Sequence, residues 1–279
     1  PHGPLHVPER YTKAFRDNPE VPASLAYFYG MIASIDENLG RLRSHLSARG
    51  IDRDTIVIFM NDNGTAHGAT LKTEGKPDRN GWVAGGFNSG MRGRKGSAYE
   101  GGHRAACFFH WPAGGLSGGR DLDGLTAHLD VMPTLIDLCD LKQSQSTKFD
   151  GTSLAEPLRT SAKRVKTRVL LVHHQGRFGK PIGEGLPIHG KDFSVMSDHW
   201  RLVGQELYDL RTDPQQRTDV SAEHAEVSSR LTKEYEQWWT DISKTFDEPN
   251  PFIIDPKQQR VVMISSQNLL GGHVAYSQH

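Results

Sequence analysis

The feature that most constrains the fold is a short apolar run that directly follows a long amphipathic helix. Between residues 24 and 49, apolar residues recur at spacings of three and four, which predicts a helix of about 25 residues with one apolar face. Residues 55–60 then form a continuous β-branched and aromatic run that is too short for a typical helix. Such a run predicts a strand buried on both faces, as in a parallel sheet covered by helices. The two elements together indicate an α/β fold.

The predicted strand ends in Asn61-Asp62-Asn63-Gly64. In open α/β sheets, ligands bind outside the carboxyl ends of the strands, so we expect the chemistry of the chain here. The Asp62 carboxylate and the Asn63 amide oxygen are hard donors that suit Ca²⁺ or Mg²⁺ rather than zinc. Taken alone, Asp-Asn-Gly is also an ordinary turn sequence, because these residues are the common turn formers.

Two other segments carry polar groups suited to an anionic ligand. Within residues 93–104, Lys95 lies between Gly93 and Gly96, and His103 and Arg104 follow two glycines. Lys95 and Arg104 can offset the charge of an oxyanion ester. At the start of the chain, prolines flank His2, which a rigid backbone would present as an acid, a base or a hydrogen-bond donor. The alternatives are a solvated cationic loop and a proline-rich linker.

The pattern changes after about residue 165, so we divide the chain into a larger domain, residues 1–165, and a smaller one, residues 166–279. Short apolar runs at 168–173, 193–196 and 200–203 predict a small antiparallel sheet. A helix from about 223 to 242 is expected to pack against that sheet. Its inner face would carry Val227, Leu231, Tyr235, Trp238 and Trp239.

Composition narrows the partners of the chain. Basic and acidic residues number 33 each, so no charge excess points to nucleic acid, and no apolar run is long enough to predict a membrane span. Cys107 and Cys139 form no close pair, which argues against a zinc or redox motif and suggests two buried apolar residues. We assign no metal site to the scattered histidines 173, 174, 189 and 199, and we expect the tryptophans to be core residues rather than a sugar platform.

In their order along the chain, these segments resemble the sulfatase family of the alkaline phosphatase-like superfamily. The resemblance runs through "PHGPLHVPERY", the helix, "NDNG", "GMRGRKGSAYEGGHRAACFFHWPAG", "HLDVMPTLIDL" and "WRLVGQELYDLRTDPQQRTDV". It covers the chain from residue 1 to about residue 242. The implied fold is an alkaline phosphatase-like α/β sandwich that lacks its amino-terminal part, followed by the small antiparallel subdomain.

The resemblance also implies a function, hydrolysis of a sulfate ester on a sulfated small molecule or carbohydrate. Asp62 and Asn63 would bind Ca²⁺, with Mg²⁺ as a substitute, and Lys95 would contact the sulfate and the leaving-group oxygen. His2 would bind the sulfate or protonate the leaving alkoxide. His103 and Arg104 would contact the substrate. Many members are exported, so the resemblance implies a periplasmic or secreted protein.

One central part of the family's machinery is missing from the sequence. Sulfatases make a formylglycine nucleophile from the Cys or Ser of a C/S-x-P-x-R motif, and neither Cys107 nor Cys139 begins such a motif. We therefore expect a fragment that is inactive alone and whose partner is the missing amino-terminal portion. The alternatives are a phosphoester or phosphonate hydrolase of the same superfamily and a non-catalytic binding module.

Overall fold

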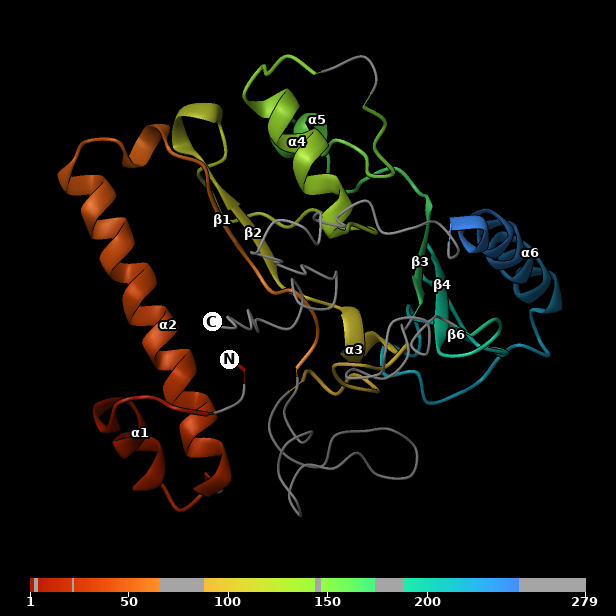
Figure 1. Cartoon of the computed structure of the whole chain (residues 1–279), viewed down its shortest axis with the longest axis horizontal. Coiled ribbons are helices and arrows are strands. Elements are labelled where there is room, and N and C mark those ends of the chain that lie inside the picture. The colour runs from red at the N-terminus through yellow and green to blue at the C-terminus, as the bar shows by residue number, and fades with distance from the viewer. Residues whose placement is uncertain (3–4, 22, 66–87, 144–146, 174–187, 246–279) are drawn as a thin grey trace, which may run out of the picture.

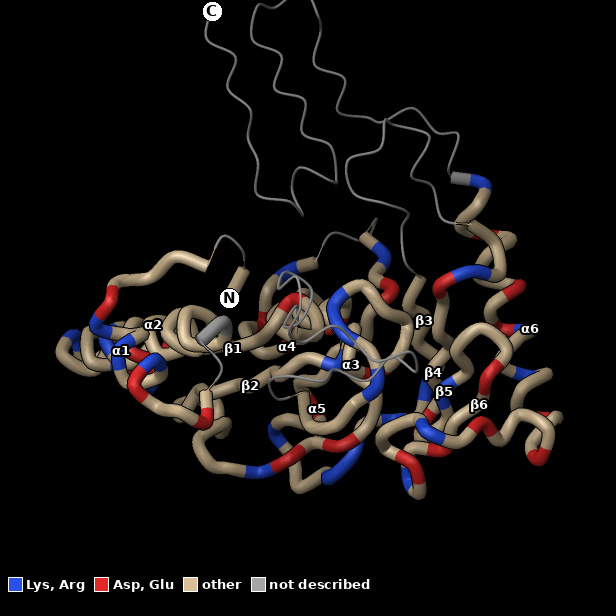
Figure 2. Tube along the Cα trace, turned by 90° about the horizontal axis from the view of Figure 1, so that it is seen from below, with Lys and Arg blue, Asp and Glu red and all other residues tan. Residues whose placement is uncertain are grey.

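The computed structural model describes residues 1–2, 5–21, 23–65, 88–143, 147–173 and 188–245. Figure 1 shows α2 along one side, the β1–β2 pair in the middle, and the sheet of β3 to β6 with α6 at the other side. Acidic and basic residues are interspersed along the described trace (Figure 2), in keeping with the balanced composition. Across the part of the chain that the structure describes, no helix is both long and apolar enough to cross a membrane.

Two helices form the amino-terminal layer, α1 (Glu9–Arg16) and α2 (Ala23–Ala48). They meet at Gly30, where an added Cβ would lie 2.8 Å from the Thr12 side chain. The helix predicted from residue 24 is thus confirmed, but its apolar stripe is only partly covered. The stripe residues Ile32, Ile35 and Leu42 remain 43%, 41% and 48% exposed.

The central strands differ from the prediction in their direction. β1 (Val57–Met60) pairs with β2 (Cys107–His110) in antiparallel register, with Val57 opposite His110 and Met60 opposite Cys107. Among the described residues this is a two-stranded sheet, and β1 is half-buried rather than enclosed on both faces. The prediction of a parallel strand was wrong for this pair because an apolar run reports a tendency to be buried, whereas direction depends on a partner almost fifty residues away.

Short helices connect the central pair to the rest of the molecule. They are η1 (Asp52–Asp54), α3 (Glu100–His103), η2 (Pro112–Gly114), η3 (His128–Asp130), α4 (Val131–Leu138) and α5 (Ala155–Arg159). Leu116, Leu138 and Ala155 form a buried cluster against which Phe109 and Trp111 pack. Both cysteines are exposed, which corrects the expectation of burial: Cys107 lies in the thinly covered β2 and Cys139 follows the end of α4.

The carboxyl-terminal strands confirm the predicted antiparallel sheet, whereas the division of the chain at residue 165 stays a prediction. β3 (Val169–His173), β4 (Phe193–Ser197), β5 (Trp200–Val203) and β6 (Glu206–Asp209) pair in sequence order as an antiparallel meander. α6 (Ala225–Ile242) covers it and ends in η4 (Ser243–Thr245). The core contains Phe193, Val195, Leu202, Leu207, Leu231 and Tyr235, with Val227, Trp238 and Trp239 packed around it. The predicted inner face of α6 is therefore correct, and the two tryptophans belong to the core and its rim.

Candidate functional site

The predicted metal pair lies in the loop that follows β1, which we call the strand-end loop (residues 61–65). Backbone hydrogen bonds hold the residue before the pair and the residue after it: Asn61 N donates to Ala106 O at 3.0 Å, and Gly64 N donates to Gly102 O at 3.0 Å. Asp62 is exposed and Asn63 is half-buried, and both line a cavity of about 1190 Å³. The pair therefore presents two oxygen donors to an accessible space.

Glycines allow three backbone segments to approach one another around the strand-end loop. A Cβ added to Gly64 would lie 1.9 Å from Gly101 O, and one added to Gly102 would lie 2.0 Å from Ser97 O. Gly93, with φ of +83°, has Ser97 Oγ 2.5 Å from the position of its missing Cβ. A side chain at any of these positions would push the segments apart, so the glycine spacing is a packing requirement.

Lys95 belongs to the segment of residues 88–99, which we call the lysine loop. Its backbone N donates to Thr65 O at 2.8 Å, so the lysine loop is attached to the strand-end loop three residues after Asp62. Lys95 is half-buried. Among the described residues that line the cavity are Asp62, Asn63, His103 and Arg104, whereas Lys95 is not one of them.

The two predicted substrate contacts lie at the carboxyl end of α3. The Nε2 atom of His103 is 3.2 Å from Ala98 O, and burial lowers the pKa of this imidazole below its ordinary value despite the nearby Glu100 carboxylate. His103 is therefore suited to stay neutral, with Nε2 donating to the Ala98 carbonyl. Arg104 is exposed, and its Nη1 donates to Glu100 Oε2 at 3.3 Å.

His2, the predicted acid, is exposed near the amino terminus. Val7, five residues further on, is buried, and its side chain lies 3.2 Å from where a Cβ on Gly30 of α2 would be. Val7 thus lies against α2, while the proposed role of His2 stays a prediction.

Glu100 is a residue that the sequence reasoning missed. Only 2% of it is exposed, and Oε1 accepts a hydrogen bond of 2.6 Å from Nε of Arg201 in β5. Burial favours the neutral acid, but Arg201, His103 and Arg104 together outweigh it and hold the pKa of Glu100 below its ordinary value. The available signal was Arg201 itself, a charged residue in an apolar strand, which calls for a buried partner.

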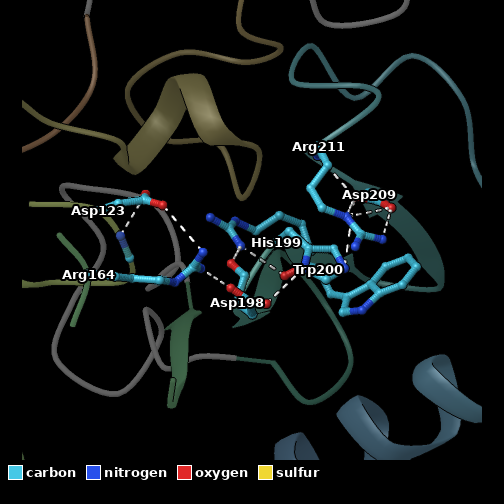
Figure 3. Close-up of polar contacts among 9 residues, drawn as sticks. Asp123, Arg164, Asp198, His199, Trp200, Asp209 and Arg211 are labelled. Atoms are coloured by element: carbon cyan, nitrogen blue, oxygen red, sulfur yellow. Dashed lines mark hydrogen bonds and ion pairs between the residues drawn. The ribbon is translucent and has the colours of Figure 1, made fainter. Parts of the chain in front are cut away.

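Figure 3 shows a second polar group, of which Asp123, Arg164, Asp198, His199 and Arg211 also line the cavity. His199 Nδ1 lies 2.9 Å from Asp198 Oδ2, and His199 Nε2 lies 4.0 Å from Asp209 Oδ1. Arg164 pairs with Asp198 and, at 3.4 Å, with Asp123, while Arg211 Nη2 donates to Asp209 at 2.7 Å. Arg164 and Arg211 each pair with a carboxylate, so this group presents ion pairs rather than charges of one sign.

The other histidines that were set aside have structural surroundings where they are described. His173 stacks among Phe193, Tyr235 and the α6 tryptophans, and His189 pairs with Glu236 at 2.9 Å. His174 and Trp82 lie outside the described residues, and Trp111 packs beside the Leu138 cluster. Within the described ranges, no three His, Cys, Asp or Glu side chains lie close enough together to hold a metal ion. Asp62 and Asn63 carry oxygen donors of the kind that suits a hard cation, and their role as its ligands stays a prediction.

The family model "Sulfatase" matches residues 1–141, the part that contains the strand-end loop, the lysine loop and α3. The chain belongs to the sulfatase family. A steryl-sulfatase of Mus musculus is 35% identical to this sulfatase-family chain over 161 residues, which are 57% of the chain and 24% of that protein. The chain thus spans about a quarter of that curated relative.

Solved structures show the same fold. The crystal structure of Ps i-CgsB in complex with k-i-k-neocarrahexaose matches with a TM-score of 0.66 at 22% identity, over 85% of this chain and 48% of that one. The structure of BT4656 in complex with its substrate D-glucosamine-2-N,6-O-disulfate gives 0.55 at 16% identity, over 86% and 47%. A phosphonate monoester hydrolase of Agrobacterium radiobacter gives 0.50 at 21% identity, over 78% and 42%. These likenesses confirm the predicted partial alkaline phosphatase-like α/β fold.

Proposed function

We propose that this chain forms part of a sulfuric ester hydrolase and supplies half of its cation site together with its sulfate-binding lysine. The observation that carries the proposal is the joining of three segments, two of which, the strand-end loop and α3, line one cavity. The strand-end loop, the lysine loop and α3 are held together by backbone hydrogen bonds and close glycine contacts, all within the residues that the sulfatase model matches. Fixed polar groups around an anionic substrate are the usual source of electrostatic catalysis.

In this proposal Asp62 and Asn63 hold Ca²⁺, or Mg²⁺ in its place, because their oxygen donors suit a hard cation. When bound, such a cation would offset the charge on the sulfate oxygens. Lys95 donates to the sulfate and to the leaving-group oxygen, and His2 delivers a proton to the departing alkoxide. His103 and Arg104 contact the substrate, Arg104 through a charge-assisted hydrogen bond.

We further propose that the nucleophile comes from another stretch of polypeptide. The 279 residues contain no C/S-x-P-x-R motif, and the matched part of each relative or solved structure described above is less than half of that protein. The exposed apolar residues Ile32, Ile35 and Phe108 offer surface that such a stretch would cover, since Phe108 is 63% exposed in the central sheet. In this account the isolated chain binds Ca²⁺ weakly and does not turn over sulfate esters.

The substrate that we propose is a sulfated carbohydrate or an aryl sulfate, acted on in the periplasm or outside the cell. The family resemblance supports the compartment, and the disulfated glucosamine bound to the similar BT4656 supports the substrate class. A phosphonate or phosphoester hydrolase is the second candidate, because a phosphonate monoester hydrolase shares the fold. One lysine-bearing loop and one pair of ligands for a single cation, Asp62 and Asn63, favour a sulfatase over a phosphatase with two zinc ions.

Two experiments test the proposal. The DNA upstream of the Pro1 codon can be read for an in-frame C/S-x-P-x-R, whose presence supports an enzyme, whereas a start codon beside Pro1 favours a non-catalytic module. Turnover of an aryl sulfate and of an aryl phosphate can then be compared in a protein that contains both parts. Faster turnover of the sulfate supports the proposal, and faster turnover of the phosphate supports the second candidate.

A further inference from the structure

The Glu100 carboxylate joins the candidate site to a different part of the fold. Its partner Arg201 lies in the middle of β5, and the side chains of the pair are 3% and 7% exposed. The Glu100 backbone N also donates at 2.8 Å to the side-chain oxygen of Gln216, a residue that is completely buried. Both contacts tie the first residue of α3 to the carboxyl-terminal sheet and to the loop that follows β6. We call these contacts the Glu100 anchor.

The same helix contacts the proposed cation ligands through its backbone. Gly101 and Gly102 follow Glu100 directly, and Gly102 O accepts the hydrogen bond from Gly64 N. Gly64 leaves no room for movement toward α3, because its missing Cβ would lie 1.9 Å from Gly101 O. A displacement of α3 therefore shifts Gly64, and with it the adjacent Asn63 and Asp62.

A second set of contacts holds the lysine loop to the same sheet. The Arg92 guanidinium lies 3.9 Å from the ring centre of Tyr99 and donates at 2.6 Å to the hydroxyl of Tyr208 in β6. Both tyrosine hydroxyls donate to Glu206 Oε2, at 2.6 and 2.7 Å. The segment from Arg92 to Glu100 is thus attached to the sheet at both ends, by Arg92 to β6 and by Glu100 to β5.

We infer that Glu100 is a positioning residue for the candidate site: through Arg201 it fixes α3 on the carboxyl-terminal sheet and thereby sets the positions of Asp62, Asn63 and Lys95. The chemical role of those three residues rests on the proposed function, but their positioning does not. The sheet of β3 to β6 is accordingly part of the scaffold of the site rather than a separate module. A substitution that removes only one member of the pair leaves the other charge buried without a partner, which is costly in stability.

Hydrogen–deuterium exchange of the 279-residue chain tests this inference without any activity measurement. Glu100→Gln keeps the shape of the side chain and removes its charge. We expect peptides covering residues 61–65 and 95–102 to exchange about tenfold faster in this variant, because the local opening of α3 becomes easier. The helix α6 packs on the same sheet away from α3, so the exchange rates of peptides that cover it are expected to change less than about twofold.

Glu37→Gln is the matched control, because it removes an exposed carboxylate that also bonds to an arginine, Arg10, at 3.1 Å. It should leave residues 61–65 and 95–102 unchanged. Arg201→Lys provides a second variant if Glu100→Gln does not fold, since it keeps the positive charge but loses the donor at Nε.

The inference is overturned if exchange at residues 61–65 is unaffected in both anchor variants, or if α6 accelerates by the same factor, which would indicate general destabilisation. Failure of the proposed function has a different signature: no sulfate turnover by the wild-type protein that contains both parts, whatever the exchange data show.

Discussion

Replacement of Gly64 by alanine tests the packing of the strand-end loop directly. The new Cβ would lie 1.9 Å from Gly101 O, whereas ordinary contact begins near 3.4 Å, so one of the two backbones must move by roughly 1.5 Å. Such overpacking costs about 1–3 kcal/mol, and loss of the hydrogen bond from Gly64 N to Gly102 O adds about 1 kcal/mol. We expect Gly64→Ala to lower the free energy of unfolding by about 2–4 kcal/mol.

Gly40→Ala is the control for this substitution. Gly40 lies inside α2, and its added Cβ would meet nothing within 4 Å. Alanine there should raise the free energy of unfolding by about 0.5–1 kcal/mol, because glycine is a poor helix residue. Urea titrations followed by tryptophan fluorescence and far-UV circular dichroism would measure both variants. A Gly64→Ala midpoint equal to that of the wild type would refute the packing argument, as would equal losses in the two variants.

Three other predictions concern stability and reactivity. The pKa values of Glu100 and His103 both lie below their ordinary values in the folded chain. At a pH between the folded and the unfolded pKa of either group, the unfolded chain therefore binds more protons than the folded one. The melting temperature should fall as the pH drops from 7 to 4, and a rise would contradict this. Leu231→Ala removes a fully buried side chain from the sheet–helix core and should cost about 2–5 kcal/mol in urea unfolding, whereas a loss within experimental error would show that the core is elsewhere. Cys107 and Cys139 are exposed and should both react with a thiol reagent in native buffer; protection of either one until urea is added would place it in the core after all.

Elements with a regular apolar period were predictable from the sequence. The spacing of three and four fixed α2 and α6 to within a few residues, and it correctly placed Leu231 and Tyr235 on the inner face of α6. The strands of the carboxyl-terminal sheet followed from short apolar runs separated by turns, with the exception of β6. That strand, Glu206–Asp209, has polar residues at both ends, so its sequence resembles a loop.

Features that depend on distant partners were not predictable in the same way. The antiparallel direction of β1 is set by β2, and the exposure of Cys107 by how little of the described chain covers that strand. The strand-end pair Asp62 and Asn63 was visible as a local motif, because it interrupts an apolar run. The Glu100 anchor was not, because its partners lie more than a hundred residues further along the chain.

The most direct test of the account is aryl sulfate turnover with and without the Asp62 carboxylate. It would be measured for the 279-residue chain alone and for a protein that joins it to a formylglycine-bearing stretch, each as wild type and as Asp62→Ala. The account predicts no turnover by the chain alone, turnover by the joined protein, and a loss of about a hundredfold or more in joined Asp62→Ala. Turnover by the isolated chain, or full activity in joined Asp62→Ala, would contradict it.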